Sequence, residues 1–242
     1  MLAEKPIAKD VSTAGDLIAW TQDPSNTSAT YSVAENFRFL DSFIYGAAQL
    51  ATLGRVLSFR SRVSMFVHPG GKYFETAWRK TPQYQGGFLL DGGVHFVAGT
   101  RLLLRAAGEE LTRVCAFSAQ LQPHLPPVDT LHAVLQTGSG VGGSLSVSFG
   151  TTDKGSEYVV AAEKGTVSVL RGKVVVTRDG VSEEKDFADE GSGVKQEVKA
   201  WAEGLAQGKP NAQQSAEEAL KDLRILEAAL RSGEAGGQPV EL

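Results

Sequence analysis

The chain has 242 residues, of which 42% are hydrophobic and 21% charged, and its formal net charge at pH 7 is −4. This length and composition indicate a globular protein with a sizeable core, in one large domain or two small ones, and exclude a disordered or fibrous chain. Lysine and arginine are scattered and form no basic run, so we expect neither nucleic acid nor an anionic membrane as a partner.

The single cysteine, Cys115, excludes an internal disulfide framework and fits a reducing compartment. Its strand-like surroundings favour a buried small hydrophobic residue over a nucleophile. Charged Glu4 and Lys5 interrupt any apolar run at the start, which excludes a signal peptide. Residues 130–152 are uncharged but rich in Gly, Ser and Thr, and part of them alternates like a strand rather than a membrane span. We therefore expect a cytoplasmic protein.

The first part of the chain alternates between short extended segments and helices. Residues 1–8 are typical of a strand end and a turn, and residues 10–20 form an amphipathic pattern that predicts a helix. A loop at 23–26 and an extended segment at 31–34 follow. Apolar residues at helical spacing then predict a helix from residue 40 onward that stops at Gly54.

From Arg55 onward the pattern becomes mostly that of strands. Residues 56–66 are β-like, residues 67–85 are expected to form a loop, and residues 88–106 a helix that ends at Gly108. The strands predicted next are about 111–121, 129–137, 143–150, 156–162, 165–170 and 173–178. Short links, several containing glycine, join them, and such links favour antiparallel pairing.

Two helices are expected near the end of the chain. An apolar stripe from Val194 to Leu205 predicts the first, and the capping-box pattern Ser215 to Glu218 begins the second. Together the elements predict an α+β fold, with a mostly antiparallel open sheet of about six strands and helices on one face. Water or another subunit must cover the other face of such a sheet.

One G-x-G-x-x-G pattern occurs, at residues 138–143. A phosphate-binding loop of this type needs a strand before it and a helix after it. Here a strand pattern follows, so we interpret the segment as a hairpin turn.

Asp91 and His95 are the best candidates for chemistry. They lie four residues apart in a predicted helix, and therefore on one face of it. The pairs Gly86-Gly87 and Gly92-Gly93 bracket the aspartate and permit a ligand or another backbone to approach closely. A histidine oriented by a carboxylate can act as a general acid or base near neutral pH. A helix-capping aspartate and a satisfied core histidine explain the spacing equally well.

Lys5 and the loop around Trp78 are weaker candidates. Between Glu4 and Pro6, an exposed loop lysine would be unremarkable, but an ammonium beside a carbonyl or alcohol can stabilise a developing alkoxide. Trp78-Arg79 lies in a polar and aromatic loop of the kind that binds ligands, where arginine can clamp a phosphate or carboxylate.

Several of these motifs occur in a fixed order: Glu4-Lys5-Pro6, residues 34–39 (AENFRF), Trp78-Arg79, residues 86–95 (GGFLLDGGVH), and a terminal helix pair ending in residues 236–242 (GGQPVEL). In this combination the chain resembles, over nearly its whole length, the Gfo/Idh/MocA family of NAD(P)-dependent oxidoreductases. The stretch 71–79 points to the fungal branch related to a yeast NADPH-dependent enzyme.

The resemblance implies an N-terminal Rossmann domain followed by a C-terminal substrate and oligomerisation domain. Residues 1–35 would be a remnant of the end of the first domain, and residues 36–242 the second. Roughly 100 residues with the glycine motif, an ordinary domain size, would be missing before them, so that the chain is expected to be N-terminally truncated. A homodimer or higher oligomer through the open sheet face is the implied assembly.

The resemblance also implies roles for single residues. The catalytic group would be Lys5, Asp91 and His95, with His95 exchanging the proton of the substrate hydroxyl. The residues implied to contact the cofactor, NADP in preference to NAD, are Glu4, Pro6, Asn36, Trp78 and Arg79. Those implied to contact the small-molecule substrate are Tyr73, Arg79 and His95, and no metal ligand is implied.

The implied function is hydride transfer between the nicotinamide and a CH–OH group of a sugar-like or other small alcohol or carbonyl compound. The alternative is a non-catalytic binding or dimerisation module, because the cofactor-binding glycine motif is absent from the sequence. An incomplete gene reading is a third explanation of the same absence.

Overall fold

The computed structural model describes residues 1–27, 29–71, 73–82 and 87–242. Its helices are α1 (Val11–Gln22), α2 (Asp41–Leu50), α3 (Ala77–Lys80), α4 (Gly87–Ala106), α5 (Val194–Ala206) and α6 (Ala216–Glu234), with 3-10 turns η1 (Asn36–Phe39) and η2 (Ala212–Gln214). Its strands are β1 (Leu2–Ala3), β2 (Ser32–Val33), β3 (Val56–Phe66), β4 (Leu111–Ala119), β5 (Thr130–Thr137), β6 (Gly142–Ser148), β7 (Gly150–Ala162), β8 (Gly165–Leu170), β9 (Lys173–Arg178), β10 (Val181–Asp186) and β11 (Val240–Glu241).

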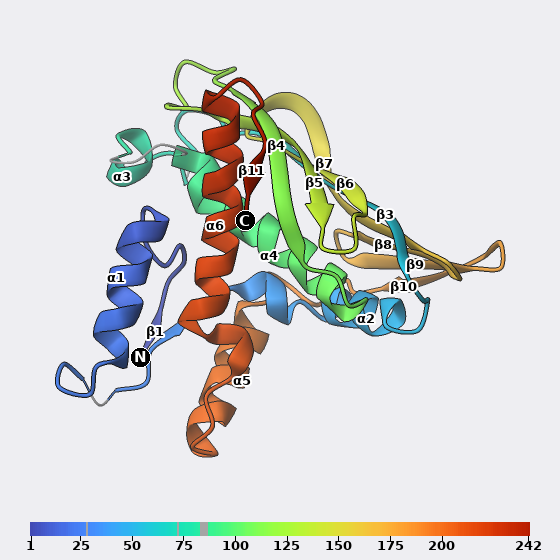
Figure 1. The fold of residues 1–242 in the computed structure, drawn as a ribbon, viewed down its shortest axis with the longest axis horizontal. Coiled ribbons are helices and arrows are strands. Elements are labelled where there is room, and N and C mark those ends of the chain that lie inside the picture. Colours follow the sequence, from blue (N-terminus) through green and yellow to red (C-terminus); the bar gives the residue numbers. More distant parts are fainter. Residues whose placement is uncertain (28, 72, 83–86) are drawn as a thin grey trace.

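A nine-stranded sheet dominates the fold, in the order β10-β9-β8-β7-β3-β6-β5-β4-β11. Every neighbouring pair is antiparallel except β3 and β6, which run parallel. Helices α2, α4 and α6 lie on one face of this sheet (Figure 1). The expected α+β fold, with a mostly antiparallel sheet and helices on one face, is therefore confirmed.

The sheet is larger than the expected six strands because β3, β10 and β11 join it. All six residues of β10 are exposed, and five of them are polar, so the segment lacks the alternation of apolar residues that marks a half-buried strand. β11 has only two residues. The glycine pattern at 138–143 connects antiparallel β5 and β6, so the prediction of a hairpin turn is confirmed.

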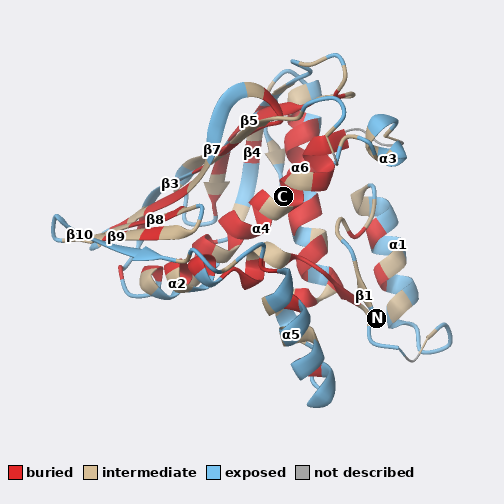
Figure 2. Ribbon diagram, turned by 180° about the vertical axis from the view of Figure 1, so that it is seen from behind, coloured by how far each residue is buried: buried red, intermediate tan, exposed pale blue. Residues whose placement is uncertain are grey.

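The core lies between the sheet and α4, which is buried along most of its length (Figure 2). A Cβ added to Gly92 would lie 2.5 Å from the Phe149 ring, and one added to Gly93 would lie 3.1 Å from Leu226. These glycines allow the sheet and α6 to pack closely against α4 rather than leaving room for a ligand. Gly86, the first glycine of the other pair, lies outside the described residues, as does Lys72.

A second, two-stranded sheet pairs β1 with β2 in parallel, and α1 connects them as in a βαβ unit. Ala14 and Ile18 of α1 are buried, and the Glu227 carboxylate of α6 accepts the Val11 N–H at 2.6 Å. The assignment of residues 1–35 to a nucleotide-binding domain stays a prediction.

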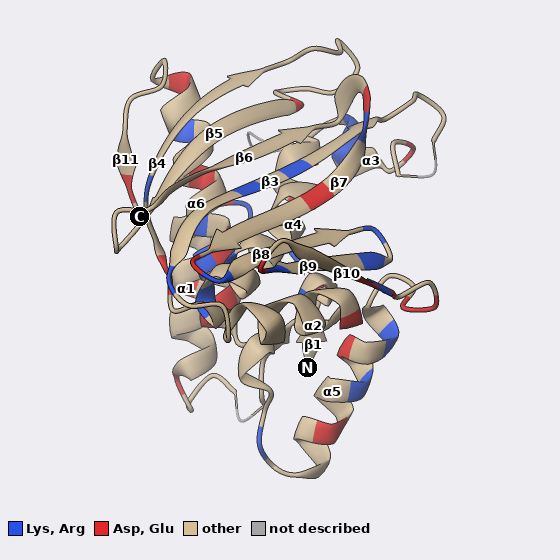
Figure 3. Ribbon diagram, turned by 90° about the vertical axis from the view of Figure 1, so that its right-hand side faces the viewer, with Lys and Arg blue, Asp and Glu red and all other residues tan. Residues whose placement is uncertain are grey.

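The face of the large sheet opposite the helices is open. Arg60 and Arg62 of β3 form ion pairs on this side with Glu157 and Asp153 of β7, and Figure 3 shows basic residues on β3 beside acidic residues on β7. Cys115 of β4 is half-buried, so the expectation that it is a buried residue is wrong. Among the described helices, none has the length and hydrophobicity that crossing a membrane requires.

Candidate active site

The parallel pairing of β1 and β2 brings two charged residues to one edge. Leu2 lies opposite Ser32 and Ala3 opposite Val33. Lys5 and Glu35 each lie two residues after the end of their strand, and the carboxyl ends of neighbouring parallel strands meet at the same edge. A cation and a carboxylate separated by 30 positions in the sequence are thus presented together.

Helix α4 carries the two residues that contact Lys5 and Glu35, namely Asp91 and His95. The Lys5 Nζ atom lies 2.8 Å from Oδ1 of Asp91 and also donates to the Asp91 backbone carbonyl at 2.5 Å. One turn further along α4, the His95 Nδ1 atom lies 2.6 Å from Oε1 of Glu35. The predicted i, i+4 spacing on one helix face is therefore matched by two strand ends, each contacting one residue of the helix.

Arg79 completes the surroundings of Asp91. Its Nε atom donates to the second carboxylate oxygen, Oδ2, at 2.8 Å. Its guanidinium lies 4.1 Å from the centre of the Trp78 ring and 5.6 Å from that of Tyr73. Trp78 is 53% exposed and Tyr73 66% exposed, so these rings cover the arginine and remain open to a ligand.

The site holds two buried carboxylates in their charged form. Burial would raise the pKa of Asp91, but the Arg79 hydrogen bond and the Lys5 charge outweigh it and hold the pKa below its usual range. Burial would likewise raise the pKa of Glu35, but the charge and hydrogen bond of His95, together with the Arg38 charge, lower it. Both groups are therefore ionised at neutral pH.

These contacts exclude one of the interpretations given for Asp91 and describe the surroundings of His95. Asp91 lies inside α4, and its two oxygens face Lys5 and Arg79, so the capping interpretation is wrong. The His95 side chain is 18% exposed, and the Phe37 ring stacks on it with centroids 5.1 Å apart. In the part of the chain that the structure describes, its Nδ1 edge has a hydrogen-bond partner and its Nε2 edge has none.

The other predicted site residues are placed differently. Glu4 is exposed and Pro6 is half-buried beside Lys5. The Asn36 amide donates to the Ser192 carbonyl, at the loop before α5. Sequence reasoning missed Glu35 altogether, although it stands in the motif at 34–39, because only the β1–β2 register shows that it lies level with Lys5.

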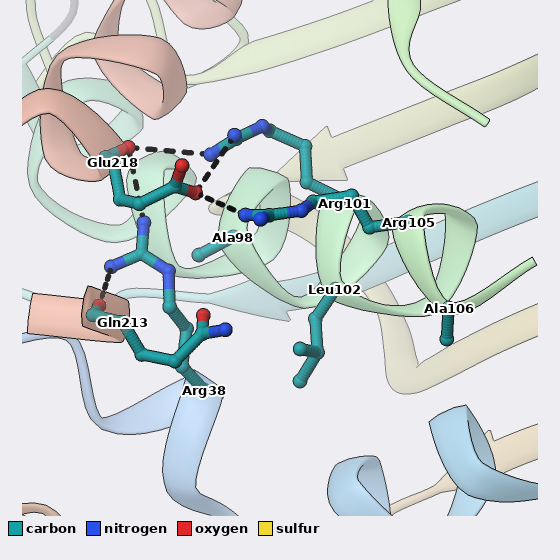
Figure 4. Close-up of a pocket in the computed structure, with 8 residues that line it drawn as sticks. All are labelled: Arg38, Ala98, Arg101, Leu102, Arg105, Ala106, Gln213 and Glu218. Atoms are coloured by element: carbon teal, nitrogen blue, oxygen red, sulfur yellow. Dashed lines mark hydrogen bonds and ion pairs between the residues drawn. The ribbon is translucent and has the colours of Figure 1, made fainter. Parts of the chain in front are cut away.

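A cavity of about 230 Å³ lies further along α4, and Figure 4 shows its lining. Arg101 donates to Glu218 at 3.0 Å and to Asp222 at 2.5 Å, and Arg105 donates to Glu218 at 2.9 Å. Arg38 pairs with Asp222 as well. The charged groups in this cavity are occupied by one another, so we assign it a structural role and place the candidate active site at Asp91 and His95.

Comparisons with known proteins identify the class to which this fold and site belong. A family model described as "Oxidoreductase family, C-terminal alpha/beta domain" matches residues 49–242. Dehydrogenase FPY6 of Fusarium mangiferae is 40% identical over 250 residues, which cover 98% of this chain and 69% of that protein.

Solved structures agree with this assignment. An oxidoreductase from Thermotoga maritima is 30% identical with a TM-score of 0.85, and the match covers 99% of this chain and 70% of that one. The WlbA dehydrogenase from Bordetella pertussis, solved with NADH and UDP-GlcNAcA, shares the fold at 21% identity and a TM-score of 0.76, over 100% of this chain and 71% of that one. The chain belongs to the Gfo/Idh/MocA family of oxidoreductases.

Proposed function

We propose that this chain supplies the substrate-binding and proton-transfer part of a cytoplasmic NAD(P)-dependent oxidoreductase. The complete enzyme would transfer hydride between the nicotinamide and a sugar-like or other small alcohol or carbonyl compound. The observation that carries this proposal is the meeting of Lys5, Asp91 and His95 at the carboxyl edge of the β1–β2 pair. Family membership supports an oxidoreductase, and the resemblance to the fungal branch favours NADP over NAD.

The three residues have complementary roles in this proposal. His95 exchanges the proton of the substrate hydroxyl, while the Lys5 ammonium stabilises the negative charge that develops on the substrate oxygen. Asp91 holds Lys5 in position through the 2.8 Å ion pair and also fixes Arg79. Arg79 and Tyr73 would contact the substrate.

The nicotinamide end of the cofactor fits the residues present. Dinucleotides bind at the carboxyl edges of parallel strands, which is where Lys5 lies. Trp78 and Arg79, together with Glu4, Pro6 and Asn36, would hold this end of the cofactor. The bound cofactor would supply or accept the hydride.

The pyrophosphate end does not fit the N-terminus of α1. That N-terminus is capped by the Asp10 side chain, which accepts the Thr13 N–H, and by Glu227, which accepts the Val11 N–H. Two carboxylates thus occupy backbone donors that would otherwise bind a phosphate. We therefore do not place the pyrophosphate at α1, and propose instead that it binds to a nucleotide-binding domain such as the family resemblance implies.

Substitutions in an intact relative with the same motifs test the catalytic assignment. Replacing the residues that match Lys5 and His95 by alanine should each lower kcat by at least about 100-fold, as is typical for loss of a proton-transfer group. Unchanged turnover in both variants would overturn the assignment. Exchange of the exposed residue matching Glu183, far from the site on β10, is the control.

A non-catalytic binding or dimerisation module is the second candidate, and the blocked N-terminus of α1 favours it. Phe117 and Val134, 66% and 64% exposed on neighbouring strands β4 and β5, offer apolar contacts for a homodimer. Titrating the 242-residue chain with NADPH by calorimetry tests this candidate in one direction. Micromolar affinity would contradict the non-catalytic module, whereas both candidates allow the chain alone to bind NADPH weakly or not at all. Dimers in light scattering that Val134→Asp abolishes would support assembly through the sheet face.

A further inference from the structure

Glu35 is the carboxylate of the site that the proposed mechanism has not used. Its side chain is 2% exposed, between β2 and η1, and its Oε1 atom accepts the Phe37 N–H at 3.2 Å as well as facing His95 Nδ1 at 2.6 Å. A carboxylate so deeply buried is stable only when hydrogen bonds and an opposite charge compensate it. His95 and the Phe37 N–H supply the hydrogen bonds, and Arg38 supplies the opposite charge.

The charge state of Glu35 determines which nitrogen of His95 carries the proton. An ionised carboxylate can only accept hydrogen bonds, so the hydrogen between the two groups belongs to His95 Nδ1. The neutral imidazole then has an unprotonated Nε2 atom. The Phe37 ring, inclined by 17° to the imidazole, holds the plane of the ring. Tautomer and orientation are thus both fixed.

Other titratable groups lie around Glu35 and His95, and they either stabilise or oppose the negative charge of Glu35. Arg38 from η1 stabilises the Glu35 charge. Buried Glu197 from α5 faces Glu35, and one of its oxygens, Oε1, has no hydrogen-bond partner among the described residues. Tyr158 from β7 is also buried near Glu35, and its hydroxyl is likewise without a partner in the described part of the chain. Exposed Glu4 adds a negative charge near Glu197.

We infer that Glu35 is a positioning residue, which holds His95 with Nδ1 protonated so that Nε2 faces the substrate and which stabilises the imidazolium formed there. When an alcohol is oxidised, its carbon would give up a hydride to the nicotinamide of the proposed cofactor, and its oxygen gives up a proton to His95 Nε2. The imidazolium then carries protons on both nitrogens, beside a carboxylate 2.6 Å away. In the reverse reaction Nε2 returns the proton to the oxygen. This inference rests on the proposed function, and it adds a residue that the sequence did not reveal.

The test needs no substrate and begins with the unmodified chain. The sequence has four histidines, so the ¹⁵N spectrum of the histidine-labelled protein is simple, and His95→Gln identifies the signals of His95. We expect the Nδ1–H tautomer to predominate for the neutral ring of His95, whereas free histidine in water prefers Nε2–H. A predominant Nε2–H tautomer would overturn the inference.

A charge-removing variant provides the second measurement. Glu35→Gln keeps the shape of the side chain but removes its charge, and an amide can present either its oxygen or its NH2 group to Nδ1, so the ratio of the Nδ1–H to the Nε2–H tautomer of His95 should fall by about tenfold or more. Glu183→Gln, on exposed β10, is the matched control and should leave the tautomer ratio of His95 unchanged. A Glu35→Gln protein that is folded by circular dichroism and whose His95 keeps the tautomer ratio of the wild type would contradict the inference.

The two proposals can fail separately. Nδ1–H at His95, lost in Glu35→Gln, supports the role of Glu35 even if the matching His95→Ala variant of an intact relative retains full turnover. That second result would contradict the proposed function alone. Conversely, loss of turnover in that relative together with an Nε2–H tautomer here would uphold the function and overturn the role of Glu35.

Discussion

Two ionic clusters lie along the same helix, and they differ in how completely their charges are paired. In the site cluster (Lys5, Asp91, Arg79, Glu35 and His95), the Lys5, Arg79 and His95 side chains are 14% to 18% exposed, and each keeps an edge toward solvent. In the buried cluster (Arg38, Arg101, Glu218 and Asp222), the arginines and carboxylates face one another, and Asp222 is 2% exposed.

We interpret the buried cluster as structural, whereas the proposed function gives the site cluster a catalytic role. A buried network of ion pairs gives little net stability compared with apolar packing. Removing any one member is nevertheless strongly destabilising, because a buried charge is then left unpaired. A substitution in a partly exposed cluster destabilises the protein less, and the exposed groups of such a cluster can contact a ligand. The two clusters should therefore respond in opposite ways when stability and activity are measured.

Loss of a carboxylate from the buried cluster should have the largest effect on stability. Asp222→Ala leaves Arg38 and Arg101 without their shared partner, and we expect it to lower the free energy of unfolding by about 3–5 kcal/mol. Urea denaturation measures this change. A loss below about 1 kcal/mol would show that the cluster contributes little to the fold and would remove the distinction between the two clusters.

The pH dependence of the free energy of unfolding should include a contribution from Glu197, a buried residue of α5 near Glu35. Burial, and then the nearby Glu35 charge, raise the pKa of Glu197 to about 7 in the folded protein, above its value of 4.5 in the unfolded chain. Glu197 therefore binds more protons in the folded than in the unfolded state between these values, so its contribution to stability is full below pH 4.5 and is lost as the pH rises toward 7.

The expected size of this effect is up to about 3 kcal/mol, since each pKa unit corresponds to about 1.4 kcal/mol. Glu197→Gln should remove this part of the pH dependence, which unfolding curves recorded between acidic and neutral pH would show. If the stability of the variant and that of the wild type depended on pH in the same way, the pKa of Glu197 would not be raised in the folded protein.

Asp91→Asn should have a moderate effect on stability and a large one on turnover. The amide keeps the shape but leaves Lys5 and Arg79 without a counter-charge, and because both side chains reach solvent we expect a loss of about 1–2 kcal/mol. The same change in an intact relative should lower kcat far more than the thermal midpoint. A loss of stability as large as that of Asp222→Ala would place Asp91 with the structural network.

The smallest effect is expected at an exposed ion pair. Asp153 pairs with Arg62 on the open face of the sheet, where both side chains are about half exposed. Asp153→Asn should change the free energy of unfolding by less than about 0.5 kcal/mol, and added salt should reduce even that. Denaturation curves at low and high salt test this, and a larger change would mean that the open face is not solvated.

The sequence predicted the parts of the fold that follow a local period. The i, i+4 spacing of Asp91 and His95 placed them correctly on one helix face, and the cap at Ser215 accepts the Glu218 N–H as its motif suggests. β10 escaped prediction because an exposed edge strand has no apolar alternation to show. Gly92 and Gly93 were misread since the sequence does not show that Phe149 and Leu226 pack on them.

The site could be predicted only in part, because its contacts join distant segments. Nothing in the local pattern around Glu35 indicates that its partner is His95, 60 positions away. The same holds for Arg38 and Asp222, separated by 184 positions. Such pairs depend on strand register and helix packing, which only the assembled fold determines.

The register of β1 against β2 has a consequence for how this site tolerates change. Lys5 and Glu35 each follow their strand by two residues, so a slip of one residue between β1 and β2 would shift one of the two charges along α4 relative to the other. The length of the connection between α1 and β2, by contrast, does not set their relative positions. Insertions there should leave both charges in place, whereas a single residue added between Ala3 and Lys5 should separate the ammonium from Asp91.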